Sequence, residues 1–264
     1  MTATTAALTE SSTFQRLRLF NAAMVPVHLA QGILMLLLSN DFSLPVTTSF
    51  LKFDEGSARL ITSDNTLFDL RLGPVVASFL FISALAHLLL TLPSVYPWYV
   101  RCLKRGINYV RWYEYALSAS LMIVVIAMLV GMYDLGSLIL IFALNATMLL
   151  FGLMMELHNQ TTDRVNWTAF SFGAIAGAVP WIVIGLYLLA PASRSVADVP
   201  AFVYGIYISI FFWFNSFAVN MFLQYKTVGP WRDYLFGERM YIILSLTAKS
   251  ALAWQVFAGT LRNV

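Results

Sequence analysis

Seven apolar segments follow one another along this chain, each about 20 residues long or longer. A helix rises ~1.5 Å per residue, so each segment is long enough to cross the ~30 Å apolar core of a bilayer. Backbone polar groups inside that core must be bonded within the protein, and a helix does this within one segment. We therefore predict an all-α membrane protein in which residues 1–264 form a single seven-helix domain. The expected helices lie near 17–39, 73–96, 104–132, 137–158, 166–190, 200–224 and 236–261.

Composition excludes several classes of function. Only 11% of the residues are charged, against ~25% in soluble domains, as expected for a protein that lies mostly in lipid. The basic residues are scattered rather than gathered in a stripe, so nothing indicates a nucleic-acid partner. Cys102 is the only cysteine, which excludes an internal disulfide and favours a free structural thiol. No nucleophile–base pair stands out and His158 completes no metal motif, so we predict neither an enzyme nor a metal site.

The connection between the first two helices, residues 40–72, is the only long one. Its apolar stretches at 50–53 and 58–61 flank Asp54, Glu55 and Gly56, a pattern typical of a β-hairpin. We expect this hairpin to lie on one face of the bundle. Residues 1–13 are polar, and the apolar run that follows is long enough to span, so we expect no cleavable signal peptide.

Lysine and arginine counts predict the orientation, because cytoplasmic loops are enriched in these residues. One side of the membrane would carry ten of them and the other side five. The ten are Arg16, Arg18, Arg101, Lys104, Arg105, Arg111, Arg164, Lys226, Arg232 and Arg239. The five are Lys52, Arg59, Arg71, Arg194 and Arg262. The bias predicts a cytoplasmic N-terminus, an extracellular C-terminus and a hairpin in the first extracellular loop.

Lys249 is the only charge in the apolar run 240–256 of the last helix. A charge near the middle of a span costs at least ~2.5–3.5 kcal/mol, and this one is too deep to reach the interface easily. Two uses explain such a lysine: a buried ion pair, or covalent use of the amine as a Schiff base.

The expected counter-charge is Glu114, taken to be the only carboxylate well inside a predicted helix. Arg111 lies one turn before it and is expected to pair with it or to hold water beside it. The alternative is that Glu114 merely forms a salt bridge with Arg111. Ser245 lies four residues before Lys249, on the same helical face, and its hydroxyl could bond to the nitrogen or to Glu114. By itself such a serine would more often bond to a helix carbonyl.

Two intramembrane histidines, His28 and His87, are expected at matched depth on neighbouring helices, with Ser83 one turn from His87 and Gln31 near His28. A single histidine is more often a satisfied core residue, but this pair indicates a polar cavity that could receive a proton.

Aromatic residues are dense in the sixth predicted helix, where Phe212 and Trp213 lie mid-helix, and Trp254 lies in the seventh. The mid-helix cluster is too deep to be part of an interfacial aromatic belt. It indicates either a site for a flat apolar ligand or plain packing.

Together these motifs resemble the microbial-type rhodopsins, and over the whole chain the heliorhodopsins. The resemblance rests on Ser-Leu-Thr-Ala-Lys at 245–249, Tyr-Glu-Tyr at 113–115, the paired histidines with Ser83, the inverted orientation and the long first loop. It implies a rhodopsin-like bundle in which Lys249 carries all-trans retinal as a protonated Schiff base and Glu114 is the counterion. It also implies isomerisation to 13-cis, a homodimer and no ion transport. The retinal-site residues are then Lys249, Glu114, Ser245, Ser83, Phe212, Trp213, Trp254, Tyr115, Asn145 and Met148, and the proton-accepting cavity comprises His28, His87 and Arg111.

Two positions depart from the pattern of ion pumps. Pumps carry an acid four residues before the lysine, where this chain has Ser245, and proton pumps usually place a donor carboxylate where it has Val125. We therefore predict a slow, non-pumping light sensor that signals through loops 97–105 or 227–239 to a cytoplasmic partner. Two alternatives stay open: a light-driven or light-gated ion transporter of the same fold, and a transporter or scaffold with a lysine–glutamate pair but no chromophore.

Overall fold

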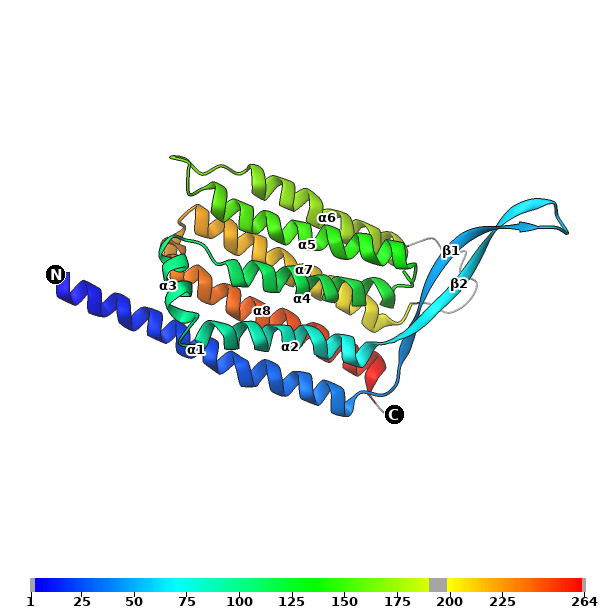
Figure 1. Cartoon of the computed structure of the whole chain (residues 1–264), viewed down its shortest axis with the longest axis horizontal. Coiled ribbons are helices and arrows are strands. Elements are labelled where there is room, and N and C mark those ends of the chain that lie inside the picture. Colours follow the sequence, from blue (N-terminus) through cyan, green and yellow to red (C-terminus); the bar gives the residue numbers. More distant parts are fainter. Residues whose placement is uncertain (1–2, 190–198, 263–264) are drawn as a thin grey trace.

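The computed structural model describes residues 3–189 and 199–262, with side chains described from Ser12 onward. Within these residues, seven long helices run side by side along one axis, and each is long and apolar enough to cross a membrane (Figure 1). These seven helices are α1 (Ala3–Leu38), α2 (Leu72–Thr91), α4 (Tyr109–Leu129), α5 (Leu135–His158), α6 (Thr168–Leu189), α7 (Ala201–Tyr225) and α8 (Tyr234–Val256). Shorter helices are α3 (Tyr96–Lys104), η1 (Gly229–Arg232) and η2 (Phe257–Leu261). The predicted all-α bundle is confirmed.

Local sequence signals explain where the helix bounds differ from those predicted. The second helix ends at Thr91 rather than near 96, because Leu92 precedes Pro93 and takes an extended conformation. The chain then forms the separate helix α3, which Gly106 ends with a positive φ of 70°. Asn108 caps the next helix by accepting a hydrogen bond from the Arg111 backbone N–H, so α4 begins at Tyr109 rather than near 104.

The remaining bounds agree more closely with the sequence. α1 is the exception, because it begins at Ala3, well before position 17. α8 ends at Val256 and continues as the π-helical turn η2 to Leu261. Ala190, the predicted end of the fifth span, and Arg194 lie outside the described residues.

The predicted hairpin is confirmed, but its expected position is wrong. Strands β1 (Ser43–Asp54) and β2 (Arg59–Arg71) pair antiparallel, from Ser43 opposite Arg71 to Asp54 opposite Arg59. They project beyond the end of the bundle that carries the C-terminus instead of lying on a face (Figure 1). Only the base is anchored: Val46 is buried, and the Thr47 N–H donates to the Tyr133 carbonyl at 2.9 Å. The strands are 12 and 13 residues long, so their outer parts extend beyond this base and pack against no helix of the described bundle.

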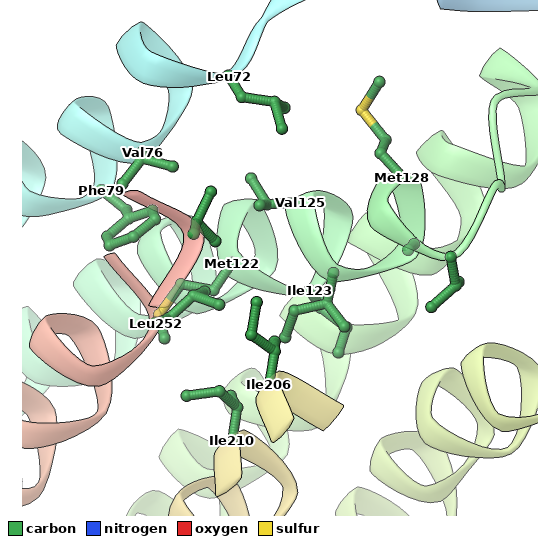
Figure 2. Close-up of a cluster of buried hydrophobic side chains, with 14 of the residues drawn as sticks. Leu72, Val76, Phe79, Met122, Ile123, Val125, Met128, Ile206, Ile210 and Leu252 are labelled. Carbon is green, nitrogen blue, oxygen red and sulfur yellow. The ribbon is translucent and has the colours of Figure 1, made fainter. Parts of the chain in front are cut away.

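The largest apolar cluster fills the half of the bundle next to the hairpin (Figure 2). It joins α2, α4, α7 and α8 through side chains that are nearly or fully excluded from solvent. Among those labelled in Figure 2 are Phe79, Met122, Val125, Ile206, Ile210 and Leu252. Smaller clusters lie toward the end that carries the N-terminus and α3. The buried polar side chains lie toward that end or at the level between the two halves.

The close approach of α4 and α5 depends on Gly152. A Cβ added there would overlap the indole ring of Trp112. Gly152→Ala is therefore expected to destabilise the protein by ~1–3 kcal/mol, the usual cost of overpacking, seen as a lower apparent melting temperature. Gly205→Ala is the matched control, because nothing lies within 4 Å of a Cβ at that helical position. That change should be neutral or slightly stabilising, and equal melting of the two variants would contradict the packing argument.

Candidate functional site

Lys249 and Glu114 meet in the interior of the bundle. The Lys249 Nζ donates to Glu114 Oε1 at 2.9 Å and to Ser245 Oγ at 2.7 Å. The lysine is 2% exposed and the glutamate 8%, so both charges are removed from solvent. α8 supplies the lysine and serine, which are four residues apart on one face, and α4 supplies the carboxylate. A buried ion pair of this geometry compensates the desolvation of both partners.

Two further side chains complete the environment of the ion pair. The Ser83 hydroxyl of α2 donates a hydrogen bond to Glu114 Oε1 at 2.7 Å. This one oxygen therefore accepts hydrogen bonds from both the serine and the lysine. The Tyr115 ring lies 5.0 Å from the Lys249 Nζ, and the Tyr115 hydroxyl donates to the Tyr241 carbonyl at 2.9 Å. The predicted residues Lys249, Glu114, Ser83 and Ser245 are thus brought together from three helices.

An apolar cavity begins at the lysine and extends between α4, α5, α6 and α7. It contains about 810 Å³ of space, its open mouth included. Lys249, Ser245, Tyr115 and Met148 line it, as the sequence predicts for a retinal site. Small residues on α5 and α6, among them Gly152 and Gly173, leave the space open.

Six of the predicted retinal-site residues do not line this cavity, of which Glu114 and Ser83 lie beside the Lys249 nitrogen instead. Phe212 is 64% exposed on the outer surface of α7. Trp213 packs against the apolar cluster of Figure 2, as does Trp254, whose indole N–H donates to Gln31 at 3.1 Å. The Asn145 amide donates to Ser120 Oγ at 3.0 Å, between α5 and α4.

Other aromatic side chains form the cavity walls. α7 contributes Phe214, Phe217, Ala218 and Met221, spaced i, i+3, i+4 and i+7, which is the inward face of one helix. Trp112 and Phe170 close the space from α4 and α6. The spacing of these α7 residues can be seen in the sequence. It does not identify the inward face, because aromatic residues occur on every face of this helix.

His28 and His87 stack with ring centroids 5.5 Å apart, at an interplanar angle of 12°. The Oδ1 atom of Asn21 lies 2.8 Å from the Nδ1 atom of His87. Asn21 was not among the site residues predicted from the sequence. Because the Asn21 Nδ2 donates to the Leu17 carbonyl, its oxygen accepts, and His87 carries its proton on Nδ1. Neither ring nitrogen of His28 has a hydrogen-bond partner within the described chain.

A second, smaller cavity lies on the N-terminal side of the ion pair. Apolar side chains such as Leu90 and Ile242 form part of its wall, and the polar side chains in it include Asn21, His87, Asn108, Arg111, Glu114 and Glu238. It contains about 360 Å³ of space, its open part included. Glu114 therefore faces a polar cavity on one side, while Lys249 faces the apolar cavity on the other.

The predicted salt bridge between Arg111 and Glu114 is wrong, whereas the alternative that Arg111 holds water beside Glu114 stays a prediction. Arg111 forms salt bridges with Glu156 of α5 and Glu238 of α8, and all three side chains are buried. Helical side chains lean toward the helix N-terminus, which carries the guanidinium away from Glu114. Asn108 joins the same cluster, donating from its side chain to Glu238 at 2.7 Å and from its backbone N–H to Glu156 at 2.9 Å.

This cluster also overturns the expectation that Glu114 is the only carboxylate well inside a helix. Glu156 and Glu238 lie near helix ends in the sequence, yet they are 1% and 2% exposed. The Arg111 guanidinium lies 3.9 Å from the Tyr241 ring centroid, so aromatic as well as acidic groups enclose it. No group of three or more potential metal-ligating His, Cys, Asp or Glu side chains occurs among the described residues.

Seven spanning helices and a buried lysine–carboxylate pair at the wall of an apolar cavity define a rhodopsin-like membrane protein. The sequence model of the heliorhodopsin family matches residues 17–261, nearly the whole chain, and the chain therefore belongs to the heliorhodopsin family. It is a retinal-binding, light-sensing membrane protein, a photoreceptor rather than an enzyme. A comparison with curated proteins found no match.

Proposed function

We propose that all-trans retinal is bound to Lys249 as a protonated Schiff base, that Glu114 is its counterion, and that the protein senses light without pumping ions. The observation that carries the proposal is the position of the Lys249 nitrogen. It lies at the wall of the apolar cavity and bonds to a buried carboxylate at 2.9 Å.

The residues present fit a polyene chromophore. The cavity is lined almost wholly by apolar and aromatic side chains, which suits a flat hydrocarbon, and its reactive amine is near Ser245 at one end. When bound, retinal supplies light absorption and the all-trans to 13-cis isomerisation. The aromatic faces of Phe217 and Trp112 would restrict where the polyene can move.

Glu114 and the two serines have separate electrostatic roles in this proposal. Glu114 compensates the positive charge on the Lys249 nitrogen, which burial alone would disfavour. Ser83 holds the carboxylate from α2, and Ser245 accepts a hydrogen bond from the nitrogen. In the dark state, the positive charge of the Lys249 nitrogen is thereby held in place at the cavity wall.

The apolar half of the bundle supports a non-pumping reading. A proton leaving Lys249 toward the hairpin would meet the layer formed by Met122, Ile123, Val125 and Leu252, which are buried and carry no titratable group (Figure 2). Transport needs a relay on both sides of the nitrogen. The polar cavity on the other side, with His87 in its wall and His28 stacked on it, supports local transfer and return of the proton.

The membrane arrangement is part of the same proposal. The count of basic residues favours a cytoplasmic end that carries the N-terminus and α3, and an extracellular hairpin. The signal would then leave through α3 or the η1 loop to a cytoplasmic partner. A homodimer follows from the resemblance, and the exposed apolar side chains of the hairpin, such as Leu51 and Phe53, offer it contact surface.

The proposal is tested by the absorption spectrum of the membrane-expressed protein with and without all-trans retinal. A visible band that forms with retinal and bleaches under hydroxylamine is expected. Extraction of the dark and illuminated pigment should yield all-trans and 13-cis retinal respectively. A folded protein that forms no band would contradict the proposal and favour a structural lysine–glutamate pair.

Glu114→Gln is expected to shift the visible band to the red by tens of nanometres. A unit charge ~3–4 Å away at an effective dielectric of ~20 stabilises the cation by ~4–6 kcal/mol, and part of this is lost when excitation moves charge along the polyene. Without the carboxylate the excitation energy falls. Ser83→Ala is the milder comparison, because it removes only one hydrogen bond to the carboxylate. An unshifted Glu114→Gln spectrum would place the counterion elsewhere.

Illumination of sealed vesicles is expected to produce no sustained pH change, because the apolar cluster of Figure 2 contains no titratable side chain that could relay a proton. The external pH is recorded with and without a protonophore, and a known light-driven proton pump in matched vesicles is the positive control. A lasting signal that the protonophore abolishes would support the light-driven transporter instead.

A further inference from the structure

A shallow groove on the outside of the bundle lies between α3 and α4, apart from the retinal cavity. Trp98, Cys102 and Arg105 line it from α3 and the turn that follows. Tyr109, Val110 and Tyr113 line it from the first turns of α4. Because α4 is a spanning helix that begins at Tyr109, the groove lies where the chain enters the apolar layer.

Helix α3 presents a cationic and aromatic face to this groove. Tyr99, Cys102 and Leu103 are buried against the bundle, which fixes the helix in place. Trp98, Arg101, Cys102 and Arg105 are spaced i, i+3, i+4 and i+7, so they share one face. The Arg105 carbonyl accepts a hydrogen bond from Gln160 at 2.7 Å, which holds the end of this face to the α5–α6 connection.

The charge on this face is positive and uncompensated. Arg101 and Arg105 are exposed, and neither forms a salt bridge with an acidic side chain of the described chain. The nearby carboxylates Glu156 and Glu238 are buried and bonded to Arg111. A guanidinium in this position suits a phosphate, which it can bind through two parallel hydrogen bonds.

Below the charge, the groove becomes apolar and aromatic. Trp98 and Tyr109 stack with centroids 6.0 Å apart, and such rings favour the headgroup level of a membrane. Val110, Tyr113 and Leu117 continue down the outer surface of α4, where Tyr113 and Leu117 are more than half exposed. A ligand that is anionic at one end and hydrocarbon at the other matches a groove that is cationic at one end and apolar at the other.

We propose that the groove between α3 and α4 binds an anionic phospholipid, with its phosphate at Arg105 and an acyl chain along Val110, Tyr113 and Leu117. Arg101 adds to the local positive potential, and Trp98 packs against the glycerol region. The site is independent of retinal, since none of its residues lines the retinal cavity.

Native mass spectrometry of the full-length protein in detergent tests the site, with phosphatidylglycerol and phosphatidylcholine of identical acyl chains as probes. The wild type is expected to retain phosphatidylglycerol more strongly. Arg105→Gln should weaken that retention about fivefold, the ratio that ~1 kcal/mol per basic residue near a membrane surface corresponds to. Trp98→Leu should weaken the binding of both lipids, and it provides a second test if the arginine variant does not fold.

Arg164→Gln is the matched control, because it removes the same charge from the same end of the bundle but lies outside the groove. Its phosphatidylglycerol retention should equal that of the wild type. Equal loss in the Arg164 and Arg105 variants would overturn the site in favour of a diffuse surface charge. Full retention by both Arg105→Gln and Trp98→Leu, or equal wild-type retention of the two lipids, would overturn it as well.

Discussion

Lys249→Ala is expected to abolish the visible band that forms when the protein is supplied with all-trans retinal. No other lysine of the described chain lines the retinal cavity, so no other ε-amine can form the Schiff base there. The loss should be complete rather than graded, because the bond is covalent. Absorption spectroscopy after retinal addition measures it, with size-exclusion chromatography to show that the variant is folded.

Stability must be separated from pigment loss in this variant, because Lys249→Ala leaves Glu114 buried without its cation. Breaking a buried pair in this way costs ~3–5 kcal/mol. The double variant Lys249→Ala/Glu114→Gln should recover much of that stability and still form no pigment. Ser245→Ala, which keeps the amine and the carboxylate, should form pigment. A coloured Lys249→Ala protein would refute the Schiff-base assignment.

Arg111→Gln is expected to destabilise the protein by ~3–5 kcal/mol, since it leaves two buried carboxylates without their shared cation. Glu156 and Glu238 come from α5 and α8, and Arg111 holds both to α4. The variant should therefore melt at a markedly lower temperature, followed by circular dichroism at the helical bands or by loss of pigment colour.

Charge removal elsewhere provides the control for this prediction. Arg239 pairs with Asp233 at 3.4 Å, but both side chains are largely exposed, so Arg239→Gln should cost no more than ~1 kcal/mol. Adding Glu156→Gln and Glu238→Gln to Arg111→Gln should restore much of the lost stability, because no uncompensated charge is then buried. If Arg111→Gln melts like Arg239→Gln, the cluster contributes little to the fold.

The Lys249–Glu114 pair and the Arg111 cluster lie close together, but the Lys249 and Arg111 variants test different properties. The Tyr115 ring faces Lys249, and its hydroxyl donates to the carbonyl of Tyr241, whose ring contacts Arg111. The ion pair at the retinal cavity and the arginine cluster are thus neighbours through two tyrosines. Under the proposed function the first sets the colour of the pigment, whereas the second joins α4, α5 and α8.

The architecture and the buried ion pair could both be predicted from the sequence. Seven long apolar segments form helices in a bilayer, because each segment must satisfy its backbone hydrogen bonds internally. Lys249 and Glu114 could be identified because a charge within a span is costly enough to require a partner. Ser245 and Ser83 followed from one-turn spacing on a helix and from the family resemblance, and these side chains do meet at the ion pair.

Contacts of side chains near helix ends or on crowded helix faces could not be predicted from the sequence, because they depend on how the helices pack. Glu156 and Glu238 look like surface residues in the sequence, but the packing of α4, α5 and α8 buries them around Arg111. Phe212 and Phe217 look alike in the sequence, but the rotation of α7 turns one toward lipid and the other into the cavity. Helix length and insertion cost are local properties of a segment, whereas the rotation and contacts of a helix depend on all its neighbours.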